Sequence, residues 1–159
     1  MRLPLIMLAF SLAAPAWAAD CEPWKAEMME DEGGPVMTAA VCAMTNGKSS
    51  DLLVSCGGDV LAFRYLAVLP DNFPPEGTTE FHTNLDLKID GKTHTVDAVF
   101  EEMDGALAFY PKRSDPLVAA MKSGKSLTIS TKDGTTTPVT LPLKNAAQAL
   151  EKVEKSCGG

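Results

Sequence analysis

The segment FHTNLDLKIDGKTHTVDAVF, residues 81–100, decides the fold that the sequence predicts. Asp90-Gly91 at its centre is a strong signal for a two-residue turn between antiparallel strands. This turn places Leu85 opposite Val96, and it gives the hairpin one mostly apolar face and one mostly polar face. We therefore expect the apolar face to lie on the core and the polar face to meet water.

The register of this hairpin assigns each side chain to one of the two faces. The apolar face carries the pairs Phe81–Phe100, Thr83–Ala98, Leu85–Val96, Leu87–His94 and Ile89–Lys92. The polar face carries His82, Asn84, Asp86 and Lys88 opposite Val99, Asp97, Thr95 and Thr93. Because the two histidines fall on opposite faces, they are not expected to share a metal ion or to act as a catalytic pair.

The N-terminal segment Met1–Ala18 has the pattern of an export signal. Arg2 precedes an apolar run, and Ala16-Trp17-Ala18 matches an A-x-A cleavage site. No later stretch approaches the roughly 20 apolar residues of a transmembrane helix. We expect residues 19–159 to form a single disulfide-stabilised β-rich domain that is periplasmic or secreted, with no transmembrane segment.

The charge balance excludes some partners. The chain has 21 acidic and 14 basic residues and a formal net charge of −7. This acidity disfavours nucleic acid and anionic membrane surfaces as partners. It also serves simply to keep an exported protein dispersed, so it does not identify a partner.

The four cysteines indicate two structural disulfides, because an even number in an exported chain favours bridging. Their wide spacing does not resemble a zinc site. Cys21 precedes the first expected hairpin and Cys42 lies near its end, which favours a bridge between them. Cys56 ends a strand and Cys157 lies on the apolar stripe of the last helix, which favours the second bridge.

The other segments predict further hairpins and two helices. The expected strands are 24–29 and 36–43 around a turn at 30–35, then 52–56 and 60–68 around Gly57-Gly58-Asp59, then 106–110, 127–131 and 139–141. Residues 46–50 and the proline-rich 70–78 are expected to be loops. A three-residue turn with a bulge after residue 131 would place Ile129 opposite Val139.

The two helices have clear boundaries in the sequence. Asp115 can cap a short helix that has Pro116 at its first position and ends at Gly124. Residues 145–157 form an amphipathic helix whose apolar stripe is Ala146, Ala147, Leu150, Val153 and Cys157. The sequence therefore predicts a mainly β fold, either a β-sandwich or a partly open barrel of antiparallel hairpins, with a short helix and a C-terminal helix.

No catalytic, cofactor-binding or metal-binding residue is assigned from the sequence. There is no G-x-S-x-G elbow, no phosphate-binding glycine loop and no cysteine left for nucleophilic work. Arg64 interrupts an apolar strand and is expected to reach water or to pair with a carboxylate. The methionines suggest copper binding by thioethers as one interpretation, but filling of the core is the interpretation we favour. These methionines are Met28, Met29, Met37, Met44, Met103 and Met121.

From Leu52 to Cys157 the order of features resembles the invasion-associated locus B type of small secreted domain and the related VasI-like proteins that accompany type VI secretion. The features are Leu-Leu-Val-Ser before Cys56, Ile-Asp-Gly at 89–91, a helix and strand over 115–129, and a strand, helix and cysteine over 141–157. The N-terminal part departs from this pattern, since Cys21 precedes Trp24. The resemblance implies a β-sandwich-like periplasmic or secreted protein, and it supplies no catalytic residues to carry over.

We expect a non-catalytic binding or accessory protein that acts through a protein or cell-envelope partner. The candidate contact residues are Phe73, His82, Asn84 and Asp86. An enzyme of unrecognised type, and an inhibitor or immunity protein that blocks an enzyme, are the alternatives. A pocket with convergent polar groups would favour the enzyme, whereas a flat or protruding apolar patch would favour the binder.

Overall fold

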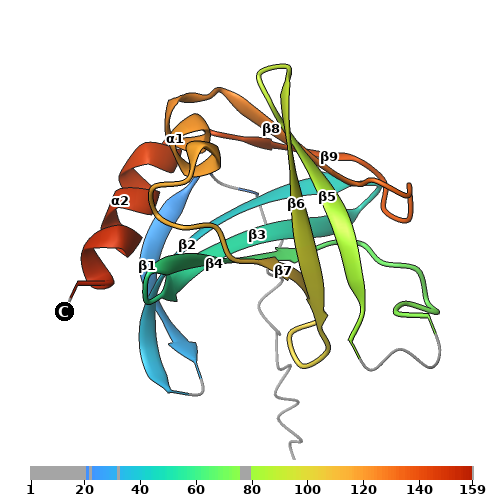
Figure 1. Cartoon of the computed structure of the whole chain (residues 1–159), viewed down its shortest axis with the longest axis horizontal. Helices are drawn as coiled ribbons and strands as arrows, with labels where there is room; N and C mark the ends of the chain where they lie inside the picture. The colour runs from blue at the N-terminus through green and yellow to red at the C-terminus, as the bar shows by residue number, and fades with distance from the viewer. Residues whose placement is uncertain (1–20, 22, 32, 76–79, 159) are drawn as a thin grey trace, which may run out of the picture.

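A computed structural model describes residues 21, 23–31, 33–75 and 80–158, so the expected export signal lies outside the described residues. Within these residues, nine strands form one antiparallel sheet in the order β1-β2-β3-β4-β7-β6-β5-β8-β9 (Figure 1). The strands are β1 (Lys25–Asp31), β2 (Gly34–Thr45), β3 (Lys48–Gly57), β4 (Val60–Leu66), β5 (His82–Ile89), β6 (Lys92–Glu101), β7 (Ala106–Phe109), β8 (Ser126–Thr131) and β9 (Val139–Pro142). The helices are α1 (Pro116–Ser123) and α2 (Ala146–Ser156).

The central hairpin has the register that its sequence predicts. Leu85 pairs with Val96 and Ile89 pairs with Lys92, and Leu85 is fully buried. Asp90 and Gly91 have φ values of 46° and 93°, as a two-residue turn that follows the strand twist requires. The Asp90 carboxylate also accepts hydrogen bonds from the backbone N–H groups of Lys125 and Ser126 at 3.0 and 3.1 Å, which ties the turn to the start of β8.

The mainly β fold class is confirmed, and it takes the form of one open sheet. The sheet bends, so that β5 and β6 run across the direction of β2, β3 and β4 (Figure 1). Residues of β2 and β9 are in contact although the two strands are far apart in the sheet order. The architecture therefore corresponds to the partly open barrel and not to two separate stacked sheets.

The expected loop at residues 46–50 is wrong. Only Asn46 and Gly47 form the turn between β2 and β3, with φ values of 52° and 76°, and Lys48, Ser49 and Ser50 belong to β3. Asn-Gly favours a two-residue turn for the same reason as Asp-Gly, because both positions need positive φ. The sequence therefore contained the signal for the β2–β3 hairpin.

The register of β8 and β9 is as expected, but the connection between them is longer. Ile129 pairs with Val139, and residues 132–138 connect the strands in place of a three-residue turn. Thr136 N donates to Thr131 Oγ1 at 2.9 Å, and Thr131 N donates to Thr136 Oγ1 at 3.2 Å. These side-chain bonds replace strand pairing next to Pro138, which has no N–H to donate.

Both ends of helix α1 lie where the sequence predicts them. Asp115 Oδ1 accepts a hydrogen bond from Leu117 N at 2.8 Å, and α1 ends at Ser123 with Gly124 as its C-cap. Gly124 has a φ of −77°, so its role is space and not backbone freedom. A Cβ at this position would lie 2.6 Å from Ile89 Cγ2, which means that glycine allows α1 to end against the central hairpin.

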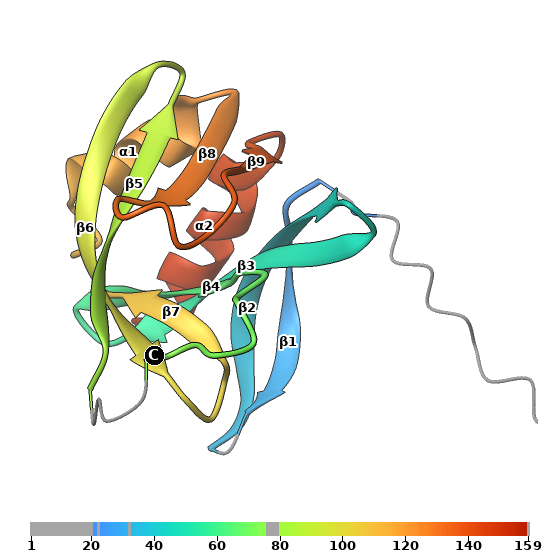
Figure 2. The same cartoon turned by 90° about the vertical axis from the view of Figure 1, so that its right-hand side faces the viewer.

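The C-terminal helix buries a stripe slightly different from the expected one. Ala149 is buried in place of Ala147, and the other buried residues of α2 are Ala146, Leu150 and Val153. Helix α2 contacts β1, β2 and β3, and the helix can be followed in the side view (Figure 2). Among the described residues, no helix combines the length and the hydropathy that crossing a bilayer requires.

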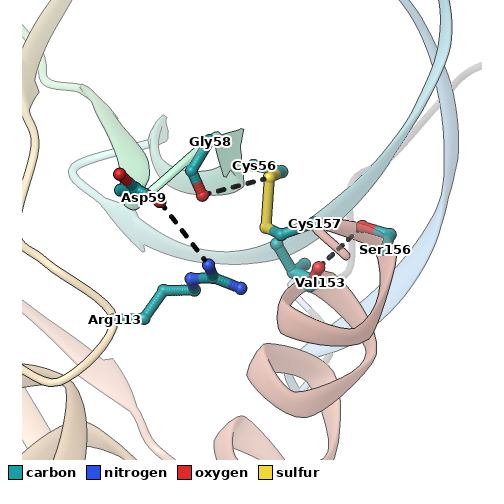
Figure 3. The surroundings of a disulfide bond; sticks show 7 residues. All are labelled: Cys56, Gly58, Asp59, Arg113, Val153, Ser156 and Cys157. Atoms are coloured by element: carbon teal, nitrogen blue, oxygen red, sulfur yellow. Dashed lines mark hydrogen bonds and ion pairs between the residues drawn. A yellow bond between two sulfur atoms is a disulfide. The ribbon is translucent and has the colours of Figure 1, made fainter. Parts of the chain in front are cut away.

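The structure contains the disulfides Cys21–Cys42 and Cys56–Cys157, which is the pairing that the sequence predicts. Cys56 lies near the end of β3, and Cys157 follows the last turn of α2 (Figure 3). Beside this bridge, Arg113 Nη2 lies 4.0 Å from Asp59 Oδ1. The second disulfide therefore fastens the C-terminal helix directly to the sheet.

Candidate interaction site on the outer sheet face

One face of the sheet points away from the core, and we call it the outer face. Arg64 pairs with Ala108, Ala108 with Val99, and Val99 with His82, so these four residues form a row across β4, β7, β6 and β5. Directly paired residues point to the same side of a sheet. The outer face is therefore continuous from Arg64 to His82.

Arg64 anchors a polar cluster on this face. Its Nε lies 2.6 Å from Glu101 Oε2 and 3.0 Å from Asp104 Oδ2. The Tyr110 hydroxyl donates a hydrogen bond to Glu101 Oε1. The expectation that Arg64 reaches water or pairs with a carboxylate is thus resolved in favour of pairing. Nothing in the sequence distinguishes Glu101 and Asp104 from the other acidic residues as partners of Arg64.

The cluster has a fixed charge state near neutral pH. Burial and the hydrogen bond to Glu101 raise the pKa of Tyr110 to about 12. Burial alone would raise the pKa of Glu101, but the hydrogen bonds from Tyr110 and Arg64 outweigh it and lower this pKa. Burial would likewise lower the pKa of Arg64, but the hydrogen bond to Glu101 and the negative charges of Glu101 and Asp104 together outweigh it and raise this pKa. The three groups are accordingly a guanidinium, a carboxylate and a neutral phenol.

A shallow cleft of about 180 Å³ lies between this cluster and the β1–β2 hairpin. Its lining combines acidic and apolar groups, namely Met29, Glu30, Asp31, Thr38, Leu53, Ser55, Arg64, Leu66 and Asp104. Since the guanidinium of Arg64 is already bound by two carboxylates, the acidic groups set the charge of the cleft. Such a surface suits a cationic group better than an anionic one.

Three of the four sequence-predicted contact residues lie together on the outer face. His82 Nδ1 is 3.1 Å from Asp97 Oδ2, and the Thr95 hydroxyl donates to Asp86 Oδ1 at 2.6 Å. His82 and Asn84 also line a shallow groove beside Lys132 and Asp133. His82, Asn84 and Asp86 therefore form one polar strip along β5.

Phe73, the fourth predicted contact residue, lies elsewhere. Its ring packs edge-on against Phe81 and Phe100, with centroid distances of 4.8 and 5.0 Å. These two phenylalanines belong to the apolar face of the central hairpin, and Phe73 is half-buried. Phe73 therefore lies on the core side of the sheet, apart from the strip on β5.

Comparison with known protein families identifies the family of the chain. A family model described as "Invasion associated locus B (IalB) protein" matches residues 74–154. The chain belongs to the invasion associated locus B family. No curated protein and no solved structure matches the chain.

The family match begins later than the resemblance expected from Leu52 onward. It contains the central hairpin, His82, Asn84 and Asp86, whereas Arg64 and the first four strands precede it. Membership of the invasion associated locus B family and two disulfides are both consistent with an extracytoplasmic protein.

The interpretation of the methionines as core residues is wrong for most of them in this family member. Met28, Met44 and Met103 are 55%, 50% and 87% exposed, and Met29 is 37% exposed. Met121 is fully buried, and Met37 packs only partly against the core. Met28 and Met29 belong to β1, most of whose residues are exposed, Met44 lies near the end of β2, and Met103 lies between β6 and β7. Within the described ranges, no group of three or more His, Cys, Asp or Glu side chains could hold a metal ion.

Tyr110 is expected to make folding stability depend on alkaline pH. Its pKa is about 12 in the folded chain and 10.0 ordinarily, so its contribution is complete below pH 10 and is lost as the pH rises towards 12. The wild type should therefore lose more stability than Tyr110→Phe over this interval. Urea unfolding of both proteins at several alkaline pH values measures the difference.

Glu101 is expected to make folding stability depend on acidic pH. Its pKa is lowered from 4.5 in the folded chain, so its contribution is present above pH 4.5 and is lost as the pH falls. Glu101→Gln should therefore flatten the acid side of the stability profile and Tyr110→Phe the alkaline side. Parallel profiles for the wild type and both variants would show that the cluster does not carry these shifts.

Proposed function

We propose that the protein is a non-catalytic binding or accessory protein, periplasmic or secreted, whose outer face receives a protein or cell-envelope partner with a basic surface. The observation that carries this proposal is the gathering of carboxylates on that face. Asp86, Asp97, Glu101 and Asp104 come from neighbouring strands and the turn after β6. The side chain of Asp97 is 69% exposed and that of Asp104 is 51% exposed, so both can meet a partner.

The physical role of these charges is recognition more than tight binding. Complementary charge accelerates encounter and suppresses wrong partners, whereas exposed ion pairs add little affinity. Affinity would come from side chains that bury apolar area beside the acids. Tyr110 and Met29 are 44% and 37% exposed next to the acidic cleft, and tyrosine is a frequent anchor of protein interfaces.

The electrostatics of the Arg64 cluster speak against a catalytic use. A general acid or base works best with a pKa near the working pH. The pKa of Glu101 is lowered and that of Tyr110 is about 12, and both oxygens of Glu101 are already bound. The cluster therefore serves to hold β4, β6 and β7 in register on the outer face. The invasion associated locus B family is also not known as an enzyme family.

Affinity capture from the cell envelope tests the proposal. We expect mature wild-type protein to retain a partner that Asp86→Asn/Asp97→Asn loses or retains at least several-fold less. The matched control is Asp59→Asn/Glu151→Gln, which removes the same charge from exposed positions away from the outer face. Equal retention by both variants, or a greater loss in the control, contradicts the outer face as the binding surface.

A further inference from the structure

A second cavity lies on the core side of the sheet, away from the outer face. Its volume is about 210 Å³. The end of the β2–β3 hairpin, the chain after β4 and the start of β9 contribute its lining residues, which are Thr45, Asn46, Lys48, Ser50, Val68, Thr137 and Val139. Apolar cavities of about 150 Å³ hold benzene, so this space suits a molecule of similar or slightly larger size.

The buried Ser50 hydroxyl lines this cavity and has no hydrogen-bond partner within the part of the chain that the structure describes, and the buried hydroxyl of Tyr65 on the neighbouring strand β4 is likewise unpaired. Ser50 and Tyr65 are both 0% exposed, and neither Ser50 Oγ nor Tyr65 Oη is paired. Burial raises the pKa of Tyr65, and the nearby Ser50 hydroxyl partly offsets this, although the two groups do not reach hydrogen-bond geometry. Buried polar groups almost always have a partner, so the unpaired Ser50 hydroxyl indicates a bound group in the cavity.

The other lining residues define the chemistry of that group. Lys48 is the charged residue among them, and it has no ion-pair partner among the described residues. Lys48 and Ser50 are two positions apart on β3 and point to the same side, at a spacing of about 7 Å that a lysine side chain can span. Val68 and Val139 supply apolar walls.

We propose that this cavity binds a short-chain aliphatic carboxylate. The carboxylate accepts a hydrogen bond from Ser50 and attracts the ammonium of Lys48, while the chain contacts Val68 and Val139. A single ligand thus gives the buried Ser50 hydroxyl a partner and neutralises the charge of Lys48.

Methyl-detected NMR of the mature protein tests this, with hexanoate as the probe and hexanol as the uncharged match. We expect hexanoate to shift the methyl signals of Val68 and Val139 saturably. Lys48→Met should weaken hexanoate binding at least several-fold and leave hexanol binding unchanged. Lys88→Met removes the same charge from the exposed polar face of β5 and should change neither.

Ser50→Ala separates ligand binding from folding. Because the wild-type hydroxyl is buried without a partner, its removal should not lower the melting temperature of the free protein, yet it should weaken hexanoate binding. Three results overturn the proposal: no saturable shift with hexanoate, equal losses in Lys48→Met and Lys88→Met, or a cavity that holds ordered water only.

Discussion

Replacing Cys56 and Cys157 together by serine is expected to lower the free energy of unfolding by about 2–5 kcal/mol. The bridge joins residues 101 positions apart, and closing a loop of about 100 residues restricts the unfolded chain by up to about 4.7 kcal/mol in the entropic model. Residual structure in the unfolded chain makes this an upper figure. Urea unfolding of the double variant beside the wild type measures the loss.

The other bridge provides the matched control for this prediction. Cys21 and Cys42 are 21 positions apart, so the same model gives their bridge a smaller contribution. The bridge at Cys157 also holds the end of α2, and terminal helices otherwise fray. Amide exchange in α2 should accelerate in Cys56→Ser/Cys157→Ser and not in Cys21→Ser/Cys42→Ser. A larger loss of stability in the latter variant contradicts the role assigned to the α2 bridge.

The second large effect is expected at Leu85. Its side chain is fully buried in the core, and Leu85→Ala removes that apolar volume from a packed site. The expected loss of stability is about 2–5 kcal/mol. Equilibrium unfolding in urea measures it, with an unchanged slope against urea concentration showing that the variant keeps its fold.

The neighbouring residue is the control for Leu85. Asp86 lies on the outer face and accepts a hydrogen bond from the Thr95 hydroxyl, so Asp86→Ala should cost less than about 1 kcal/mol. A one-residue shift of the hairpin would exchange the faces of these two positions. If Asp86→Ala proves the more damaging variant, the register of the central hairpin is incorrect.

Local signals account for the parts of the fold that the sequence predicted. Asp90-Gly91 determined the register of the central hairpin because two positive φ values in succession suit few residues. Asp115, Pro116 and Gly124 likewise marked the ends of α1. Residues 46–50 are polar, which is typical of a loop, but Asn46-Gly47 favours a two-residue turn in the same way as Asp90-Gly91.

The sheet order could not be predicted from such signals. β7 pairs with β4 as well as with β6, and β5 pairs with β8, so the order depends on contacts between segments far apart in the chain. Residues 67–81 separate β4 from β5 in the sequence, and this length permits β4 to be followed by a strand that is not its neighbour. Hydrophobic alternation identifies strands and faces, but it does not say which strands pair.

The candidate site was predicted in part, for the same reason. Alternation along β5 placed His82, Asn84 and Asp86 on the outer face, where they lie. The partners of Arg64 depend on the β4–β7–β6 pairing, so the sequence indicated a carboxylate without identifying Glu101 or Asp104. Phe73 is an aromatic residue among prolines, which made it a candidate contact residue. Its packing against Phe81 and Phe100 depends on tertiary structure that the sequence did not predict.

In-cell photocrosslinking from single positions is the most direct test of partner binding at the outer face. A photoreactive phenylalanine derivative would replace Asn84, which is exposed on that face, or Gln148, which is exposed on α2. We expect a partner adduct from position 84 that is lost when Asp86→Asn/Asp97→Asn is added, and none from position 148. An adduct from position 148 alone, or no adduct from position 84 in cells that contain the folded protein, contradicts the account.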